Sequence, residues 1–174
     1  MKKFLIVVDM QKDFVDGSLG TAEAEAIALR VAEKIAAFDG EIILTLDTHD
    51  GDYLSTAEGR HLPVMHCIRN TDGWCLDRRV AGALKGRAHL SVEKPTFGSV
   101  LLPDVIRKAA GDEDFSIELC GLCTDICVVS NALYLKANFP EKEISVDSGC
   151  CAGVTPESHK AALMTMQMCQ IDVK

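Results

Sequence analysis

The sequence predicts an α/β fold in which a parallel sheet is covered by helices on both faces. Two continuous apolar runs, residues 4–9 and 41–47, have the composition of strands that are buried on both sides. Residues 21–38 between them place apolar side chains at helical spacing, and Gly40 follows as a stop. Strand, helix and strand in this order form the β-α-β unit from which parallel sheets are built.

The same alternation continues to the end of the chain. We expect strands over 89–94, 115–121 and 143–147, an edge strand over 169–173, and helices over 101–110, 125–138 and 156–168. Residues 48–88 show no clear periodicity and are rich in Gly, Asp, His and Pro. An irregular segment of that length inside a domain is usually functional. We expect one domain over residues 1–174.

Composition limits the partners that we expect. The chain has 174 residues and a formal charge of −8, so it lacks the excess of basic residues that nucleic acid and anionic membranes attract. No apolar run approaches the roughly 18 residues of a membrane span, and the run that starts at Phe4 stops at Asp9 without a cleavage site. We therefore expect a cytoplasmic protein that acts on a small molecule, with no nucleic-acid or membrane partner.

Eight cysteines stand in a chain that has no export signal and enough apolar residues for a full core. We expect most of them to be reduced. Cys120 and Cys123 have the C-x-x-C spacing, but Cys120 lies inside an apolar strand rather than at an exposed helix start, which disfavours a redox role.

Polar residues at the carboxyl ends of the predicted strands are the first candidates for a site, because ligands of open parallel sheets bind there. These residues are Asp9, Asp47, Lys94 and Cys127. Cys127 lies where a strand leads into a helix, and a thiol beside helix N–H groups and a cation is expected to have a lowered pKa. Each residue alone also has a plain structural interpretation: a turn cap, a solvated strand end or an inert cysteine.

Five segments in order resemble the isochorismatase-type cysteine hydrolases, and nicotinamidases most closely. They are Asp9-Met-Gln-Lys-Asp-Phe14, Asp47-Thr-His49, Leu62-Pro-Val-Met-His66-Cys67, Lys94-Pro-Thr-Phe97-Gly-Ser99 and Gly121-Leu-Cys-Thr-Asp-Ile-Cys127-Val. The resemblance implies a three-layer, Rossmann-like α-β-α fold with a mostly parallel six-stranded sheet. It also implies a catalytic triad in which Asp9 is the general base, Cys127 is the nucleophile and Lys94 is the cation that orients both.

The resemblance further implies an oxyanion hole made by the backbone amides of Cys123 and Cys127, with a cis peptide bond between Leu122 and Cys123. Such donors would stabilise the tetrahedral oxyanion formed when the Cys127 thiol attacks a carboxamide. The products would be a carboxylic acid and ammonia.

Asp47, His49 and His66 form a candidate metal site, because Asp47 and His49 share one side of an extended segment and His66 follows in a Pro-containing loop. Glu58 is a candidate fourth ligand, ahead of Tyr53 and His61. This donor set suits one divalent transition metal, zinc first and iron or manganese next. The alternative is that the histidines only form hydrogen bonds within the loop.

The substrate pocket is the least determined part of the site. Phe14 matches an aromatic pocket residue of the family. Many nicotinamidases carry an aromatic residue three positions before the downstream metal histidine, where this chain has Pro63 beside Leu62. Trp74 is the candidate for the missing wall.

The leading hypothesis is a metal-containing nicotinamidase that converts nicotinamide to nicotinate and ammonia in NAD salvage, with homo-oligomers expected by analogy to the family. One alternative is a sibling cysteine hydrolase acting on another small amide or a ureido or carbamoyl compound. An alternative of a different class is a non-catalytic metal-binding or thiol-redox protein on the same fold.

Overall fold

Six parallel strands form the centre of the computed structural model, which describes residues 1–174. The strands are β1 (Lys2–Val8), β2 (Glu41–Asp47), β3 (His89–Lys94), β4 (Phe115–Leu122), β5 (Ile144–Ala152) and β6 (Asp172–Val173). They lie in the order β3-β2-β1-β4-β5-β6, and every neighbouring pair is parallel. The predicted parallel six-stranded α/β fold is confirmed.

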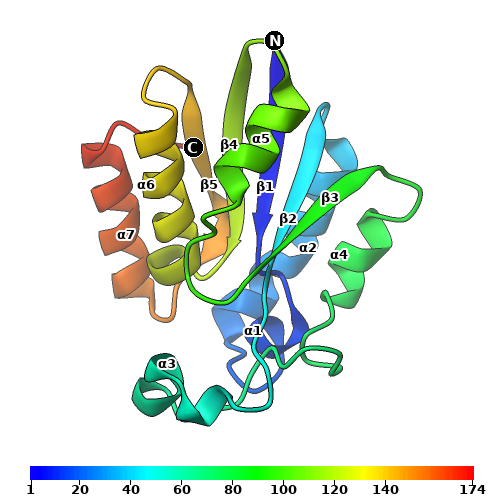
Figure 1. Cartoon of the computed structure of the whole chain (residues 1–174), viewed down its shortest axis with the longest axis vertical. Coiled ribbons are helices and arrows are strands. Elements are labelled where there is room, and N and C mark those ends of the chain that lie inside the picture. Colours follow the sequence, from blue (N-terminus) through cyan, green and yellow to red (C-terminus); the bar gives the residue numbers. More distant parts are fainter.

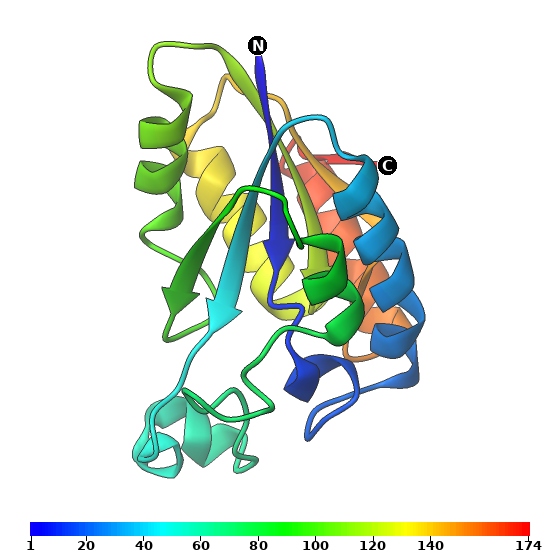
Figure 2. The same ribbon diagram turned by 90° about the vertical axis from the view of Figure 1, so that its right-hand side faces the viewer.

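Helices cover both faces of the sheet and complete the three layers (Figures 1 and 2). One face carries α2 (Ala22–Ala37) and α4 (Arg78–Ala83), and the other carries α5 (Leu102–Ala110) and α6 (Val129–Asn138), with α7 (Pro156–Met168) beside α6. The side chain of the residue just before the helix fixes where two of these helices begin. Thr21 accepts a hydrogen bond from the Ala24 N–H, and Thr155 forms a capping box with Ser158.

The core lies between the sheet and its helices. All five residues from Phe4 to Val8 in β1 are at most 1% exposed, as expected for a central strand of a doubly covered sheet. β3 is an edge strand, and its residues 89–91 are exposed. None of the helices combines the length and the apolar composition that crossing a membrane requires.

Five details differ from the sequence-based expectations. The irregular segment 48–88 contains α4 and two short helices, η1 (Tyr53–Ser55) and α3 (Ala57–His61), and α1 (Lys12–Val15) follows β1. The predicted helix over 125–138 begins with a π-helical turn, η2 (Thr124–Val128). β5 runs five residues past its expected end, because residues 151 and 152 pair with the end of β4 after a register shift. β6 has only two residues, since Gln170 adopts a positive φ of 62° just before it.

The chain folds so that a crevice forms at the carboxyl ends of β1 and β4. The strands that follow β1 first extend the sheet to one side, through β2 and β3, and then to the other, through β4. Ligands of open α/β sheets bind where the order reverses in this way. Gly121 allows the close approach of β4 to β1, because its φ is 119° and a Cβ there would lie 2.1 Å from the Val8 carbonyl oxygen. Figure 1 shows α1 and α3 beyond this end of the sheet.

Candidate active site

Asp9, Lys94 and Cys127 meet at the carboxyl end of the sheet, although they come from three separate segments. Lys94 Nζ lies 2.7 Å from Asp9 Oδ2 and 3.5 Å from Cys127 Sγ. The three residues are between 0% and 5% exposed, so their charges interact with little screening by water. The lysine is therefore a buried cation in contact with both an acid and a thiol.

Backbone geometry and one hydroxyl hold the Asp9 carboxylate. Asp9 follows β1 with a positive φ of 47°, and the Thr45 hydroxyl donates to Asp9 Oδ1 over 2.6 Å. Oδ2 forms the ion pair with Lys94. As a carboxylate oxygen, Oδ2 retains the capacity to accept a proton.

The environment of Cys127 differs from the expectation. Burial raises the pKa of the Cys127 thiol well above its ordinary value, the charge of Asp9 adds to this, and Lys94 opposes it. The expected lowered pKa is therefore wrong for the resting site, because burial raises the thiol pKa first, and the charges of Asp9 and Asp47 add to this against the single ammonium of Lys94. The thiol stays protonated until a base removes its proton.

The pKa values of the other two triad residues also shift. Burial raises the pKa of Asp9, Lys94 lowers it and the charge of Asp47 raises it, with a net shift upward. Burial alone would lower the pKa of Lys94, but the charges of Asp9, Cys127 and Asp47 outweigh it and raise the pKa. Lys94 accordingly stays charged, while Asp9 is a stronger base than an exposed aspartate.

The turn that carries Cys127 is anchored to neighbouring elements. Leu122–Cys123 is a cis peptide bond, as the resemblance implied. The Thr124 hydroxyl lies 2.8 Å from His159 Nδ1 on α7, and Asp125 accepts a hydrogen bond from the Val154 N–H. The Cys123 N–H makes no hydrogen bond within the chain.

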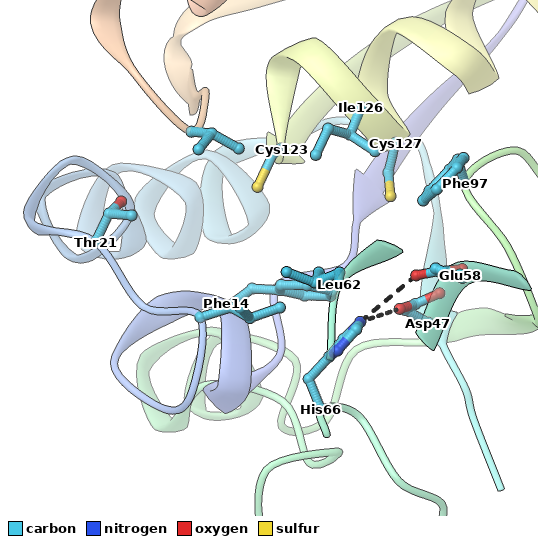
Figure 3. Close-up of a pocket in the computed structure, with 12 residues that line it drawn as sticks. Phe14, Thr21, Asp47, Glu58, Leu62, His66, Phe97, Cys123, Ile126 and Cys127 are labelled. Carbon is cyan, nitrogen blue, oxygen red and sulfur yellow. Dashed lines mark ion pairs between the residues drawn. The ribbon is translucent and has the colours of Figure 1, made fainter. Parts of the chain in front are cut away.

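Asp47, His49, Glu58 and His66 converge on one point beside the triad. One ligand atom from each lies within 4.8 Å of all the others. Asp47 Oδ2 is 3.0 Å from His49 Nε2 and 3.5 Å from His66 Nε2, and Glu58 Oε1 is 3.6 Å from His49 Nε2. Figure 3 shows His66 directed at both carboxylates. Glu58 therefore lies with the three ligands predicted first.

The two weaker candidates lie outside this cluster. The Tyr53 hydroxyl donates to the Leu62 carbonyl, and its ring packs against His49 and His66 at centroid distances of 4.6 and 4.9 Å. His61 is exposed, and its Nδ1 pairs with the Ala57 carbonyl. Tyr53 thus packs against the rings of the two histidines, while its hydroxyl is directed to Leu62 rather than to the cluster.

The donor set fits a divalent metal. His66 Nδ1 pairs with the Val64 carbonyl, which leaves Nε2 facing the cluster. Burial and the nearby charge of Asp47 raise the pKa of Glu58, a sign of two carboxylates that face each other. A cation between them would remove this repulsion. Two imidazoles with carboxylate oxygens suit zinc, iron or manganese.

A cavity of about 230 Å³ is lined by Cys127 and by three of the four candidate metal ligands, Asp47, Glu58 and His66. In Figure 3 the sulfur atoms of Cys123 and Cys127 point into it, and Asp47, Glu58 and His66 lie across from them. Phe14 lines the cavity as predicted, with its ring 5.4 Å from that of His66. The remaining lining residues were not predicted for the pocket: Leu19, Thr21, Leu62, Phe97, Ile126 and Val154.

Trp74 is not part of this lining, which corrects its assignment as the missing wall. Its indole N–H donates to the Thr48 hydroxyl over 2.9 Å, and the ring packs against the core. Leu62 and Phe97 line the cavity instead. Both residues lie in segments that carry the family resemblance, so their place in the pocket could have been predicted from these segments.

Comparisons with known proteins agree with this geometry. A family model described as an isochorismatase domain matches residues 3–173. An uncharacterized isochorismatase family protein, PncA, of Bacillus subtilis (strain 168) is 31% identical over 144 residues, which are 76% of this chain and 78% of that protein. The crystal structure of the nicotinamidase/pyrazinamidase PncA from Bacillus subtilis matches with a TM-score of 0.88 and 26% identity over 99% of each chain. The pyrazinamidase of Pyrococcus horikoshii, crystallised in complex with zinc, matches with a TM-score of 0.81 and 25% identity over 100% of this chain and 99% of that one.

Proposed function

This chain belongs to the isochorismatase family, and from that membership we propose that it is a metal-containing amidohydrolase that converts nicotinamide to nicotinate and ammonia in NAD salvage. The observation that carries the proposal is the position of Cys127. Its thiol lies in contact with the Asp9–Lys94 ion pair at one side of a cavity, and Asp47, Glu58 and His66, which form the candidate metal site together with His49, line the same cavity.

In the proposed reaction, Asp9 takes the proton of the Cys127 thiol as the sulfur bonds to the carboxamide carbon. The raised pKa values of both groups suit this order, since the thiol is neutral at rest and Asp9 is the stronger base of the two aspartates. The N–H groups of Cys123 and Cys127 would donate to the oxyanion. Lys94 stays protonated and balances the negative charge that passes from Asp9 to the sulfur and the oxyanion.

The tetrahedral intermediate collapses when Asp9 returns the proton to the departing amide nitrogen, which leaves as ammonia. A thioester of Cys127 remains. Asp9 then takes a proton from water, whose oxygen attacks the thioester carbon. Release of the acid returns the proton to the Cys127 sulfur, so the enzyme is regenerated with no net change in its protons.

Asp47, His49 and His66 would hold the metal, with Glu58 close enough to be a fourth ligand. A divalent metal with an open position can bind a ring nitrogen of the substrate and so fix the ring in the cavity. Phe14 and Leu62 contribute apolar walls for such a ring, and their contact excludes water from it. In this binding mode the carboxamide of the ring would lie beside Cys127, which lines the same cavity.

Ammonia release from a panel of small amides tests the proposal. Nicotinamide and pyrazinamide, which carry ring nitrogens, should be hydrolysed with kcat/KM well above that of benzamide, which has none. The advantage should disappear in His49→Ala, since that change removes a metal ligand. Ammonia release from a carbamoyl compound but not from nicotinamide would contradict the proposed substrate and favour a sibling hydrolase.

A further inference from the structure

Two buried primary amides outside the triad and the metal cluster each satisfy three polar groups of the backbone at the site. The first is Gln11, which is 0% exposed and lies two residues after Asp9. Its Oε1 accepts from the Asp47 N–H over 2.8 Å, and its Nε2 donates to the Asp47 and Trp74 carbonyls, each over 2.9 Å. Both backbone groups of Asp47 are thus held by one side chain.

The second amide is Asn131 on α6, also 0% exposed. Its Oδ1 accepts from the Ser99 N–H over 2.9 Å, and its Nδ2 donates to the Cys127 carbonyl over 2.8 Å and to the Phe97 carbonyl over 3.2 Å. Ser99 and Phe97 lie on the segment that follows Lys94. Asn131 therefore ties the turn that carries the thiol to the segment that follows the lysine.

We propose that these two amides divide the site between them: Gln11 is the positioning residue for the metal ligand Asp47, and Asn131 is the positioning residue for the nucleophile Cys127. The role of Gln11 rests on the metal centre of the proposed function. Neither amide has a hydrogen bond to a triad or ligand side chain, so each acts only through the backbone of the residue that it holds.

The backbone bonds explain why each amide has a local effect. With its N–H and carbonyl both held, Asp47 has a fixed Cα–Cβ direction, which keeps Oδ2 toward the histidines and Oδ1 toward Lys94. Removing a residue that orients a metal ligand commonly lowers the metal affinity by about 10–100-fold. A shift of a reacting group by about 1 Å costs about 100-fold in rate. The two amides should therefore affect different measurements.

Gln11→Met and Asn131→Leu form a matched pair, because each replaces a buried amide by an apolar side chain of similar size and removes the same number of hydrogen bonds. Zn²⁺ affinity is measured by competition with a chromophoric chelator. Alkylation of Cys127 by iodoacetamide is followed by peptide mass spectrometry, and kcat and KM are measured with nicotinamide. Thermal unfolding of each variant shows whether it is folded.

Gln11→Met should weaken Zn²⁺ binding by about 10–100-fold and leave the alkylation rate of Cys127 within about twofold of the parent. Asn131→Leu should leave Zn²⁺ affinity within about twofold and lower kcat by about 100-fold, with faster alkylation because the loosened turn exposes the thiol. Where either variant fails to fold, Gln11→Ala or Asn131→Ala replaces it. The smaller side chain leaves room for water at the freed backbone groups, and the same directions are expected.

Equal losses of Zn²⁺ affinity in the two variants would overturn the proposal that the amides have separate roles. Two amides that only stabilise the fold would affect Zn²⁺ affinity equally. Parental Zn²⁺ affinity in both Gln11 variants, with a parent that binds Zn²⁺, would overturn the role of Gln11 and leave the proposed function intact. A parent that binds no metal would overturn the metal centre and the role of Gln11 together. The alkylation and kcat measurements would still decide the role of Asn131.

Discussion

Asp47 lies 3.1 Å from the Lys94 ammonium through Oδ1, while its other oxygen, Oδ2, faces the two histidines of the metal cluster. One carboxylate therefore borders both the proposed triad and the candidate metal site. Burial alone would raise the pKa of Asp47, but hydrogen bonds from His49 and His66 and the charge of Lys94 hold it below its ordinary range. Asp47 is thus an anion in contact both with Lys94 and with the histidines.

Loss of the Lys94 ammonium should strongly destabilise the protein. Lys94→Met leaves the carboxylates of Asp9 and Asp47 buried without a cation, which costs about 3–5 kcal/mol in the free energy of unfolding. Denaturant unfolding after removal of metal measures this. Adding Asp9→Asn to Lys94→Met should recover part of the loss, since one buried charge is removed. A Lys94→Met variant within about 1 kcal/mol of the parent would show that the ion pair does not organise the core.

Asp9→Asn should lower kcat by about 10²–10⁴-fold with little change in KM, because the amide cannot take the thiol proton. Asparagine tolerates the positive φ of 47° and can still accept from the Thr45 hydroxyl, so the fold should persist. Thr45→Val is the matched control: it removes the hydrogen bond but leaves the carboxylate, and kcat should fall less. An Asp9→Asn enzyme with parental kcat would remove Asp9 as the base.

His49→Ala and His66→Ala should each weaken Zn²⁺ binding, because each removes a candidate ligand. The loss should exceed the roughly 10–100-fold that follows when a residue that only orients a ligand is removed. His61→Ala is the control from the same segment, because its side chain is exposed and lies outside the cluster, and it should bind Zn²⁺ like the parent. Metal content after gel filtration gives the comparison. Glu58→Gln tests the fourth ligand, and unchanged affinity would show that Glu58 is only a neighbour.

At acid pH the protein should lose the contribution that Asp77, the N-cap of α4, makes to the free energy of unfolding. Asp77 is 2% exposed and accepts from the backbone N–H and the guanidinium of Arg79. Burial alone would raise the pKa of Asp77, but these bonds lower it below 3.8. The stabilisation is therefore present above about pH 4 and is lost as the pH falls through the lower folded-state value.

Asp77→Asn should reduce the free energy of unfolding by about 1–2 kcal/mol near neutral pH. The difference from the parent should begin to shrink near pH 4, where Asp77 of the unfolded parent binds a proton, and should disappear below the lower pKa of the folded state. Urea unfolding of both proteins across this range measures it. A difference that stays constant with pH would mean that the charge of Asp77 contributes nothing.

The sequence predicted the sheet well because a strand buried on both faces needs a continuous apolar run, as in β1 and β2. The polar residues at the strand ends were predicted for a second reason, because parallel strands bring their carboxyl ends to one edge of the sheet. The short helices α1 and α3 were missed, because four or five residues are too few to show a period. Their positions depend on tertiary contacts.

The pocket and the thiol environment could not be predicted from the sequence for physical reasons. Val154 and Thr21 both line the cavity only because β5 ends and α2 begins near it. The pKa of Cys127 depends first on how deeply the thiol is buried and then on the distances to Asp9, Lys94 and Asp47, and residue type alone gives neither. Trp74 has a polar partner in Thr48 that no motif indicates.

Acid quenching during turnover of nicotinamide, followed by peptide mass spectrometry, tests the proposed thiol attack most directly. The peptide that contains Cys127 should carry one nicotinoyl group in the parent. Cys127→Ala should show no adduct and no ammonia release above background, and Cys169→Ser, which alters an exposed cysteine, should behave like the parent. Ammonia release from nicotinamide by Cys127→Ala at the parental rate would contradict the account.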